Sequence, residues 1–190
     1  MSSVVTSKRK ESKFIIFDLY YGLRSKLTNV LLLDFGYNTK KRIASINKMY
    51  ASNGCANMSE QQGENFDIYY KRTLGFDEWF ILEGRKAILD VMRTIGREIF
   101  LANSIYPTCM DELNDRRRHQ NNAIGQCYWL IQEMQYVMET LPVDVNKYLY
   151  VVQDIETFIT KLKNWRKANN KFKKELEKDK AKESLDKASK

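Results

Sequence analysis

Residues 110–165 read MDELNDRRRHQNNAIGQCYWLIQEMQYVMETLPVDVNKYLYVVQDIETFITKLKNW, and this stretch decides the fold. Its apolar residues recur every three or four positions on both sides of Pro142, which places them on one face of an α-helix. The first stripe is a heptad-like seam of the kind that packs against a long neighbour: Gln120, Ile124, Cys127, Ile131, Met134, Met138 and Leu141. We predict one helix over Met110–Leu141 and another that begins with Asp144 as its cap, joined as an antiparallel hairpin.

The same periodicity predicts two earlier helices. One covers Ser12–Phe35, with Ser12 as its cap and Gly36 as its stop, and the other covers Asp77–Ala102, capped by Asp77. Residues 37–75 show no clear stripe, so we interpret them as an insertion that contains a short helix over Thr39–Tyr50. Long insertions carry function in some proteins, which leaves an enzyme site within this segment as an open alternative.

Composition limits the architecture further. Two prolines and eight glycines among 190 residues are too few for the turns of an all-β domain. We expect an all-α, antiparallel up-down four-helix bundle over 12–171, with a flexible basic N-terminus at 1–11. A charged tail at 172–190 is either a frayed helical extension or disordered. The three tryptophans and 11 tyrosines line either a subunit interface or a larger core that uses the insertion. No apolar run approaches the ~20 residues of a membrane span, no secretory signal is expected, and the cytoplasm is the expected compartment.

Catalytic constellations are missing from the sequence. It contains no glycine-rich phosphate loop, zinc-protease helix or nucleophile elbow. The one histidine, His119, excludes sites built from several imidazoles. We interpret Cys55, Cys109 and Cys127 as free, buried thiols in a reducing compartment rather than metal ligands. The expectation is a protein without catalysis, cofactor or metal.

Positive charge is the main clue to function. The chain has 32 basic and 24 acidic residues, for a net charge of +8. Residues 161–174 hold seven cations and no acid, over about four helical turns, whereas a helix dipole favours cations only in the last turn. Such a cluster fits the phosphates of a nucleic acid, and Trp165 and Phe172 within it are candidates to stack on bases. Asn169 and Asn170 add amides that can reach sugar or phosphate.

Two smaller basic clusters accompany it. Arg116–His119 is a run of cationic or near-cationic side chains, although Asp111, Glu112 and Asp115 can neutralise part of it. In an up-down bundle, the basic residues 8–13 fall at the same end as the C-terminus of the fourth helix. The predicted nucleic-acid contacts are Lys8, Arg9, Lys10, Arg117, Arg118, Lys161, Lys163, Arg166, Lys167 and Lys171.

Several blocks of the sequence resemble one known family. They are SKRKESK at 7–13, ANSIYP at 102–107, AIGQCY at 123–128, LPVDVNKY at 141–148 and WRKANNK at 165–171. Together they resemble the accessory variability determinant (Avd) proteins of diversity-generating retroelements, which are similar to four-helix proteins encoded in intervening sequences of ribosomal RNA genes. The resemblance covers residues 7–12 and 76–174, and residues 37–75 depart from it.

This resemblance implies a function without catalysis. It implies a basic helical bundle that forms a homo-oligomeric ring, with a pentamer favoured. The ring is expected to bind the retroelement's reverse transcriptase and its template RNA, or an RNA–cDNA hybrid, and to support mutagenic cDNA synthesis by that polymerase. The family's contact residues are not transferred here, so the predicted sites depend on charge clustering alone. The alternative is an oligomeric protein-interaction scaffold that does not bind RNA, its cations serving only solubility.

Overall fold

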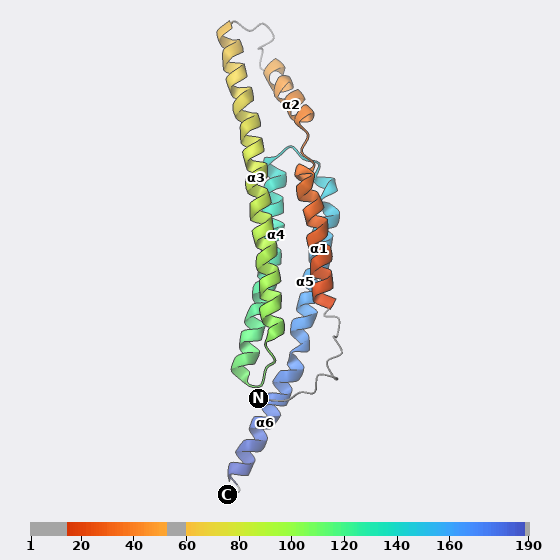
Figure 1. The fold of residues 1–190 in the computed structure, drawn as a ribbon, viewed down its shortest axis with the longest axis vertical. Helices are drawn as coiled ribbons and strands as arrows, with labels where there is room; N and C mark the ends of the chain where they lie inside the picture. The colour runs from red at the N-terminus through yellow and green to blue at the C-terminus, as the bar shows by residue number, and fades with distance from the viewer. Residues whose placement is uncertain (1–14, 53–59, 189–190) are drawn as a thin grey trace.

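The computed structural model describes residues 15–52 and 60–188, and all regular structure in these ranges is helical (Figure 1). The prediction of an all-helical chain is therefore confirmed. The elements in chain order are α1 (Ile15–Leu32), the 3-10 turn η2 (Asp34–Gly36), α2 (Thr39–Ser52), α3 (Glu60–Ser104), α4 (Met110–Thr140), the 3-10 turn η3 (Val145–Lys147), α5 (Leu149–Ala168) and α6 (Asn170–Ala188).

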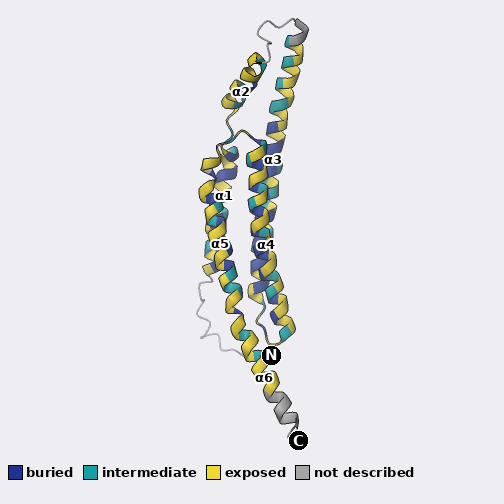
Figure 2. Cartoon of the chain, turned by 180° about the vertical axis from the view of Figure 1, so that it is seen from behind, coloured by how far each residue is buried: buried dark blue, intermediate teal, exposed yellow. Residues whose placement is uncertain are grey.

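One hydrophobic core joins α1, α3, α4 and α5, which lie side by side along the long axis of the molecule (Figures 1 and 2). Each helix contributes large side chains that are 1% exposed or less: Leu27, Ile95, Leu130 and Ile155. The apolar spacing in the sequence explains this, because residues three or four apart on each helix turn the same face inward. Burial of these stripes is the main force that holds the helices together.

Helix α3 begins at Glu60 and is 45 residues long, so the predicted start at Asp77 is wrong. Asp77 lies inside the helix with a fully buried side chain and does not cap it. The first turns of α3 pack against α2 through an aromatic cluster, in which the ring centroids of Tyr50 and Phe66 are 4.4 Å apart. We call α2 together with residues 60–76 the helical arm; it projects beyond the other helices (Figure 1). Most of the predicted insertion is therefore helical.

The end of α1 is close to the predicted position. The backbone leaves the helix at Asp34, Phe35 and Gly36, with φ angles of 51°, 57° and 70°. Glycine adopts this left-handed conformation at little cost, but Phe35 does not. Burial of Phe35 in the core compensates, and its ring packs over Gly84, where a Cβ atom would lie 3.4 Å from it. Ser12, the predicted cap, lies outside the described residues.

The C-terminal half follows the prediction with two corrections. Asp144 caps the 3-10 turn η3 by accepting a hydrogen bond from the Asn146 amide, and α5 itself begins later, at Leu149. The charged segment after Asn169 continues as helix α6 and extends away from the bundle (Figure 1). No helix among the described residues combines the length and the apolar composition that crossing a membrane requires.

Candidate nucleic-acid interface

A groove of about 350 Å³ lies between the start of α4 and the junction of α5 with α6. We call it the basic groove, and its lining residues are Arg117, Asn121, Arg166, Lys167 and Asn170. Three of the five are cations, two are amides and none is an acid. This composition attracts an anion and offers several N–H donors to its oxygen atoms.

Paired side chains cross from α4 to the α5–α6 segment along this groove. Arg117 donates to Asn170 Oδ1 at 2.6 Å, and Arg166 donates to Asn121 Oδ1 at 2.5 Å. Beyond the groove, Lys163 donates to the Tyr128 hydroxyl at 2.8 Å. From position 117 to 121 to 128 along α4, the partner residues fall from 170 to 166 to 163, so the two segments run antiparallel. The partners of Arg117, Arg166 and Lys163 are uncharged side chains. These contacts hold the cations in place without neutralising them.

A buried amide pair supports the groove from beneath. Asn169 donates to Gln120 Oε1 at 2.5 Å, and both side chains are almost completely buried. Because buried amides are costly unless they are paired, this contact favours one register of α4 against the α5–α6 junction. Sequence reasoning placed Gln120 only in the apolar seam. The signal that it missed was an amide at a seam position, facing a second amide near the end of the next helix.

The four residues Arg116–His119 point in different directions. Arg116 is buried, donates to the Ile105 carbonyl oxygen at 2.5 Å, and therefore fixes the turn between α3 and α4. Arg118 is exposed and pairs with Asp115 at 3.2 Å, whereas His119 Nδ1 lies 2.8 Å from Glu98 Oε2. Only Arg117 lines the basic groove. Arg118 was a predicted contact, but the structure does not bring it there.

The aromatic residues near this cluster have partners within the chain. The guanidinium of Arg116 lies 5.6 Å from the ring centroid of Trp165 and 5.8 Å from that of Phe172. Phe172 also meets Tyr106 edge to face, with centroids 5.6 Å apart. The structure therefore assigns Trp165 and Phe172 to an internal cation–π cluster. Stacking of these two rings on bases stays a prediction, and each ring already contacts Arg116 within the chain.

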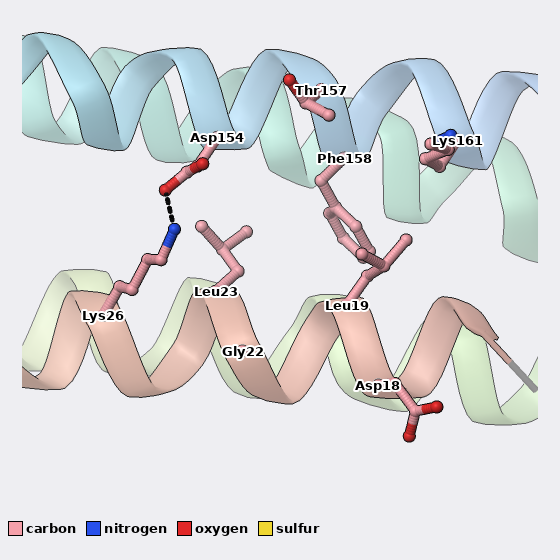
Figure 3. Close-up of a pocket in the computed structure, with 9 residues that line it drawn as sticks. All are labelled: Asp18, Leu19, Gly22, Leu23, Lys26, Asp154, Thr157, Phe158 and Lys161. Carbon is pink, nitrogen blue, oxygen red and sulfur yellow. Dashed lines mark hydrogen bonds and ion pairs between the residues drawn. The ribbon is translucent and has the colours of Figure 1, made fainter.

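Lys161 lies in a different groove, between α1 and α5 (Figure 3). There it shares the lining with Lys26, Asp18 and Asp154, and Lys26 pairs with Asp154 at 2.6 Å. Two lysines and two aspartates line this groove, so its lining has no excess charge for a polyanion. Lys161 and Arg166 are five residues apart on α5, and this spacing turns them to different sides of the helix.

The remaining predicted contacts fall outside the basic groove. Lys171 is exposed one helical turn after Lys167 but does not line the groove. Lys8, Arg9 and Lys10 lie outside the described residues, and so does the predicted convergence of the N-terminal patch with the end of α5. Three of the predicted contacts, Arg117, Arg166 and Lys167, therefore line the basic groove together, and their contact with nucleic acid stays a prediction.

The two cysteines within the described residues, Cys109 and Cys127, are free thiols. Burial raises the pKa of the Cys127 thiol to about 12, which keeps it protonated and unreactive at neutral pH. Cys109 is exposed, so its predicted burial is wrong, and Cys55 lies outside the described residues. Within residues 15–52 and 60–188, no group of three or more His, Cys, Asp or Glu side chains is placed to hold a metal ion.

Comparison of the chain with protein-family models, with curated proteins and with solved structures found no match.

Proposed function

We propose that this protein is a non-catalytic, nucleic-acid-binding accessory subunit of a diversity-generating retroelement. In this proposal it binds the element's reverse transcriptase and template RNA and supports mutagenic cDNA synthesis in the cytoplasm. The observation that carries nucleic-acid binding is the basic groove, where three cations and two amides meet without a carboxylate. The retroelement context is supported by the sequence blocks that resemble the Avd family.

We propose further that α1, α3, α4 and α5 form an antiparallel up-down four-helix bundle. Their shared core and the antiparallel contacts between α4 and α5 support this topology. The lining residues of the basic groove lie on helices α4, α5 and α6 rather than on loops. Hydrogen bonds already order Arg117 and Arg166, so binding a phosphate costs less side-chain entropy. Phosphate contacts do not depend on the base sequence.

Charge reversal tests this proposal. Arg166→Glu/Lys167→Glu should weaken RNA binding by at least about tenfold, and equally for RNAs of different sequence, because phosphate contacts are independent of sequence. Fluorescence anisotropy with labelled RNA measures the affinity. The matched control is Lys40→Glu/Lys41→Glu, which makes the same change in net charge on exposed residues of α2. Equal losses in the two variants would attribute binding to net charge and would contradict a local site.

A homo-oligomer, with a pentameric ring favoured, is the second part of the proposal. Its support is a patch of half-exposed aromatic and apolar side chains on α3 and α4: Phe76, Trp79, Leu82 and Tyr136. Phe76 and Trp79 contact each other, Phe76 stacks on the buried Phe80, and Tyr136 packs edge to face on Phe80, so the three exposed rings are connected through Phe80. Aromatic residues are enriched at protein interfaces, where they bury a large area with few rotatable bonds.

Light scattering tests the oligomer and distinguishes the alternative function. Trp79→Ala/Tyr136→Ala should lower the molar mass, whereas Tyr150→Ala, also half-exposed but on α5, should not. A wild-type monomer would contradict the oligomer. An oligomer that binds no RNA at physiological salt would instead favour the protein-interaction scaffold.

A further inference from the structure

A second groove, with a different composition, lies between α1 and α3. Its volume is about 470 Å³ and it is lined by three arginines, four aromatic residues and one glycine: Phe17, Tyr20, Tyr21, Arg24, Arg93, Gly96, Arg97 and Phe100. None of the lining residues is acidic. We call it the arginine–aromatic groove. It is separate from the basic groove, with which it shares no residue.

Two of the four aromatic side chains of this groove are exposed, those of Tyr21 and Phe100. Tyr21 is 59% exposed and Phe100 is 62% exposed, fractions that leave much of each side chain open to a ligand. Tyr21 stacks on Phe17 with an interplanar angle of 25° and packs against Tyr20, whose centroid is 5.4 Å away. Tyr20 is itself buried and donates to the Met92 carbonyl oxygen at 2.8 Å. A buried, hydrogen-bonded residue therefore holds the exposed ring of Tyr21 in place.

The arginines keep hydrogen-bonding capacity for a ligand. Arg93 pairs with Asp90 in an exposed contact at 2.6 Å. Arg97 is 3.4 Å from Glu98, whose other carboxylate oxygen lies near His119. Arg24 pairs with no carboxylate in the part of the chain that the structure describes, and its side chain interacts with the Tyr20 hydroxyl. Each guanidinium has five N–H donors, so these contacts leave donors available at all three positions.

Gly96 shapes the floor of the groove. A Cβ atom at this position would lie 2.5 Å from the Tyr20 hydroxyl oxygen, so only glycine lets the ring of Tyr20 lie against the backbone of α3. Glycine inside a helix costs about 1 kcal/mol relative to alanine. The absence of a side chain at Gly96 lets Tyr20 pack closely on α3, and Tyr20 in turn contacts the ring of Tyr21.

We propose that the arginine–aromatic groove binds single-stranded nucleic acid, with Tyr21 and Phe100 stacking on bases while Arg24, Arg93 and Arg97 contact phosphates. Exposed rings combined with cations are the pattern that binds unpaired strands, because every unpaired base offers a flat face. The inference rests on the proposed nucleic-acid function and adds a selectivity to it. The basic groove is lined by no aromatic ring and contacts backbone phosphates, which duplexes and single strands share.

The test compares two RNA probes on the full-length protein. Tyr21→Ala/Phe100→Ala should weaken binding of a mixed-sequence single-stranded RNA by at least about fivefold, the effect of losing about 1 kcal/mol of stacking. It should change the affinity for an RNA duplex of equal length by less than about twofold. The control Tyr150→Ala removes an equally exposed ring from α5 and should affect neither probe. In the wild type, crosslinks from 4-thiouridine in the single strand should map to peptides that contain Tyr21 or Phe100.

Any other outcome overturns the inference and shows whether the groove alone or the proposed nucleic-acid function as a whole is wrong. If the double variant leaves single-strand affinity unchanged while Arg166→Glu/Lys167→Glu weakens both probes, this groove is not a binding site but the proposed function stands. If the wild type binds neither probe, the proposed function fails as well. If the double variant keeps RNA binding but dissociates an oligomer in light scattering, the groove is covered by a second copy of the chain.

Discussion

Gly96 and Tyr20 illustrate how a single contact positions two helices. The ring of Tyr20 on α1 occupies the space where any other residue at position 96 of α3 would place its Cβ atom. Gly96→Ala should therefore destabilise the protein by about 1–3 kcal/mol, the usual range for overpacking a core. Urea denaturation measures the change. Gly75→Ala on the same helix meets no atom within 4 Å and should stabilise by up to about 1 kcal/mol. A stabilised Gly96→Ala would contradict this packing.

Glu98 gives the stability of the protein a dependence on pH. Burial raises the pKa of its carboxyl, but hydrogen bonds from His119 and Asn122 outweigh burial and hold the pKa below the usual 4.5. The folded state therefore binds this proton less readily than the unfolded state. The resulting stabilisation is fully present above about pH 4.5 and is lost as the pH falls through the folded-state pKa.

Glu98→Gln should accordingly make the free energy of unfolding fall less steeply with acid. The measurement is urea denaturation at a series of pH values on both sides of 4.5. Glu156→Gln, at an exposed position on α5, is the control and should keep the wild-type slope. Identical slopes for the wild type and Glu98→Gln would show that the contact with His119 does not stabilise the folded state.

At the scale of elements, the helical arm is anchored at its base by one buried carboxylate. Asp77 accepts two hydrogen bonds from Arg42, at 2.8 and 3.1 Å, and a third from the Tyr37 hydroxyl at 2.7 Å. Burial and the contact with Asp77 raise the pKa of Tyr37, so this hydroxyl stays protonated and remains a donor. Charge-assisted bonds of this kind are about twice as strong as neutral ones. This cluster joins α2 to α3.

Asp77→Asn should loosen the arm without unfolding the core. Hydrogen exchange in α2 should accelerate by about tenfold, which corresponds to about 1.4 kcal/mol, while α4 keeps its protection. Mass spectrometry of deuterated peptides measures both helices in one experiment. Lys71→Gln removes only an exposed ion pair within the arm and should leave α2 unchanged. Equal acceleration in α2 and α4 would show that the arm and the core unfold together.

The elements differ in how far sequence predicts them. The stripes of α4 and α5 face the core directly, so periodicity located Ile124, Cys127 and Met134 without a structure, although it missed the buried Leu130. The first turns of α3 pack only on α2, and Phe66 contacts a short aromatic cluster rather than a long seam. Periodicity therefore missed them, and Asp77 resembled a cap because a buried carboxylate and a capping carboxylate look alike in sequence.

The candidate site was predicted only in part for a similar reason. Charge clustering identified Arg117, Arg166 and Lys167, but it could not show that Arg116 is buried against Trp165. Nor could it identify the arginine–aromatic groove, whose cations are scattered along two helices and converge only on folding. Local composition reports charges that are close in sequence, and folding decides which of them share a surface.

In the whole molecule, the basic groove and the arginine–aromatic groove both lie near the turn that joins α3 to α4. The arginine–aromatic groove uses the last turns of α3, and the basic groove uses the first turns of α4. The helical arm extends from the opposite end of α3 (Figure 1). We expect nucleic acid to bind at the turn end, which leaves the arm and the aromatic patch on α3 and α4 for protein partners.

The dependence of RNA affinity on salt tests the central claim most directly. Neutralising three phosphate contacts with Arg117→Gln/Arg166→Gln/Lys167→Gln should reduce the slope of log affinity against log salt concentration by about 2 for single-stranded RNA. The control variant Lys40→Gln/Lys41→Gln/Lys48→Gln has the same net charge and should keep the wild-type slope. A flat dependence for the wild type, or equal slopes for the two triple variants, would contradict the assignment of phosphate binding to the basic groove.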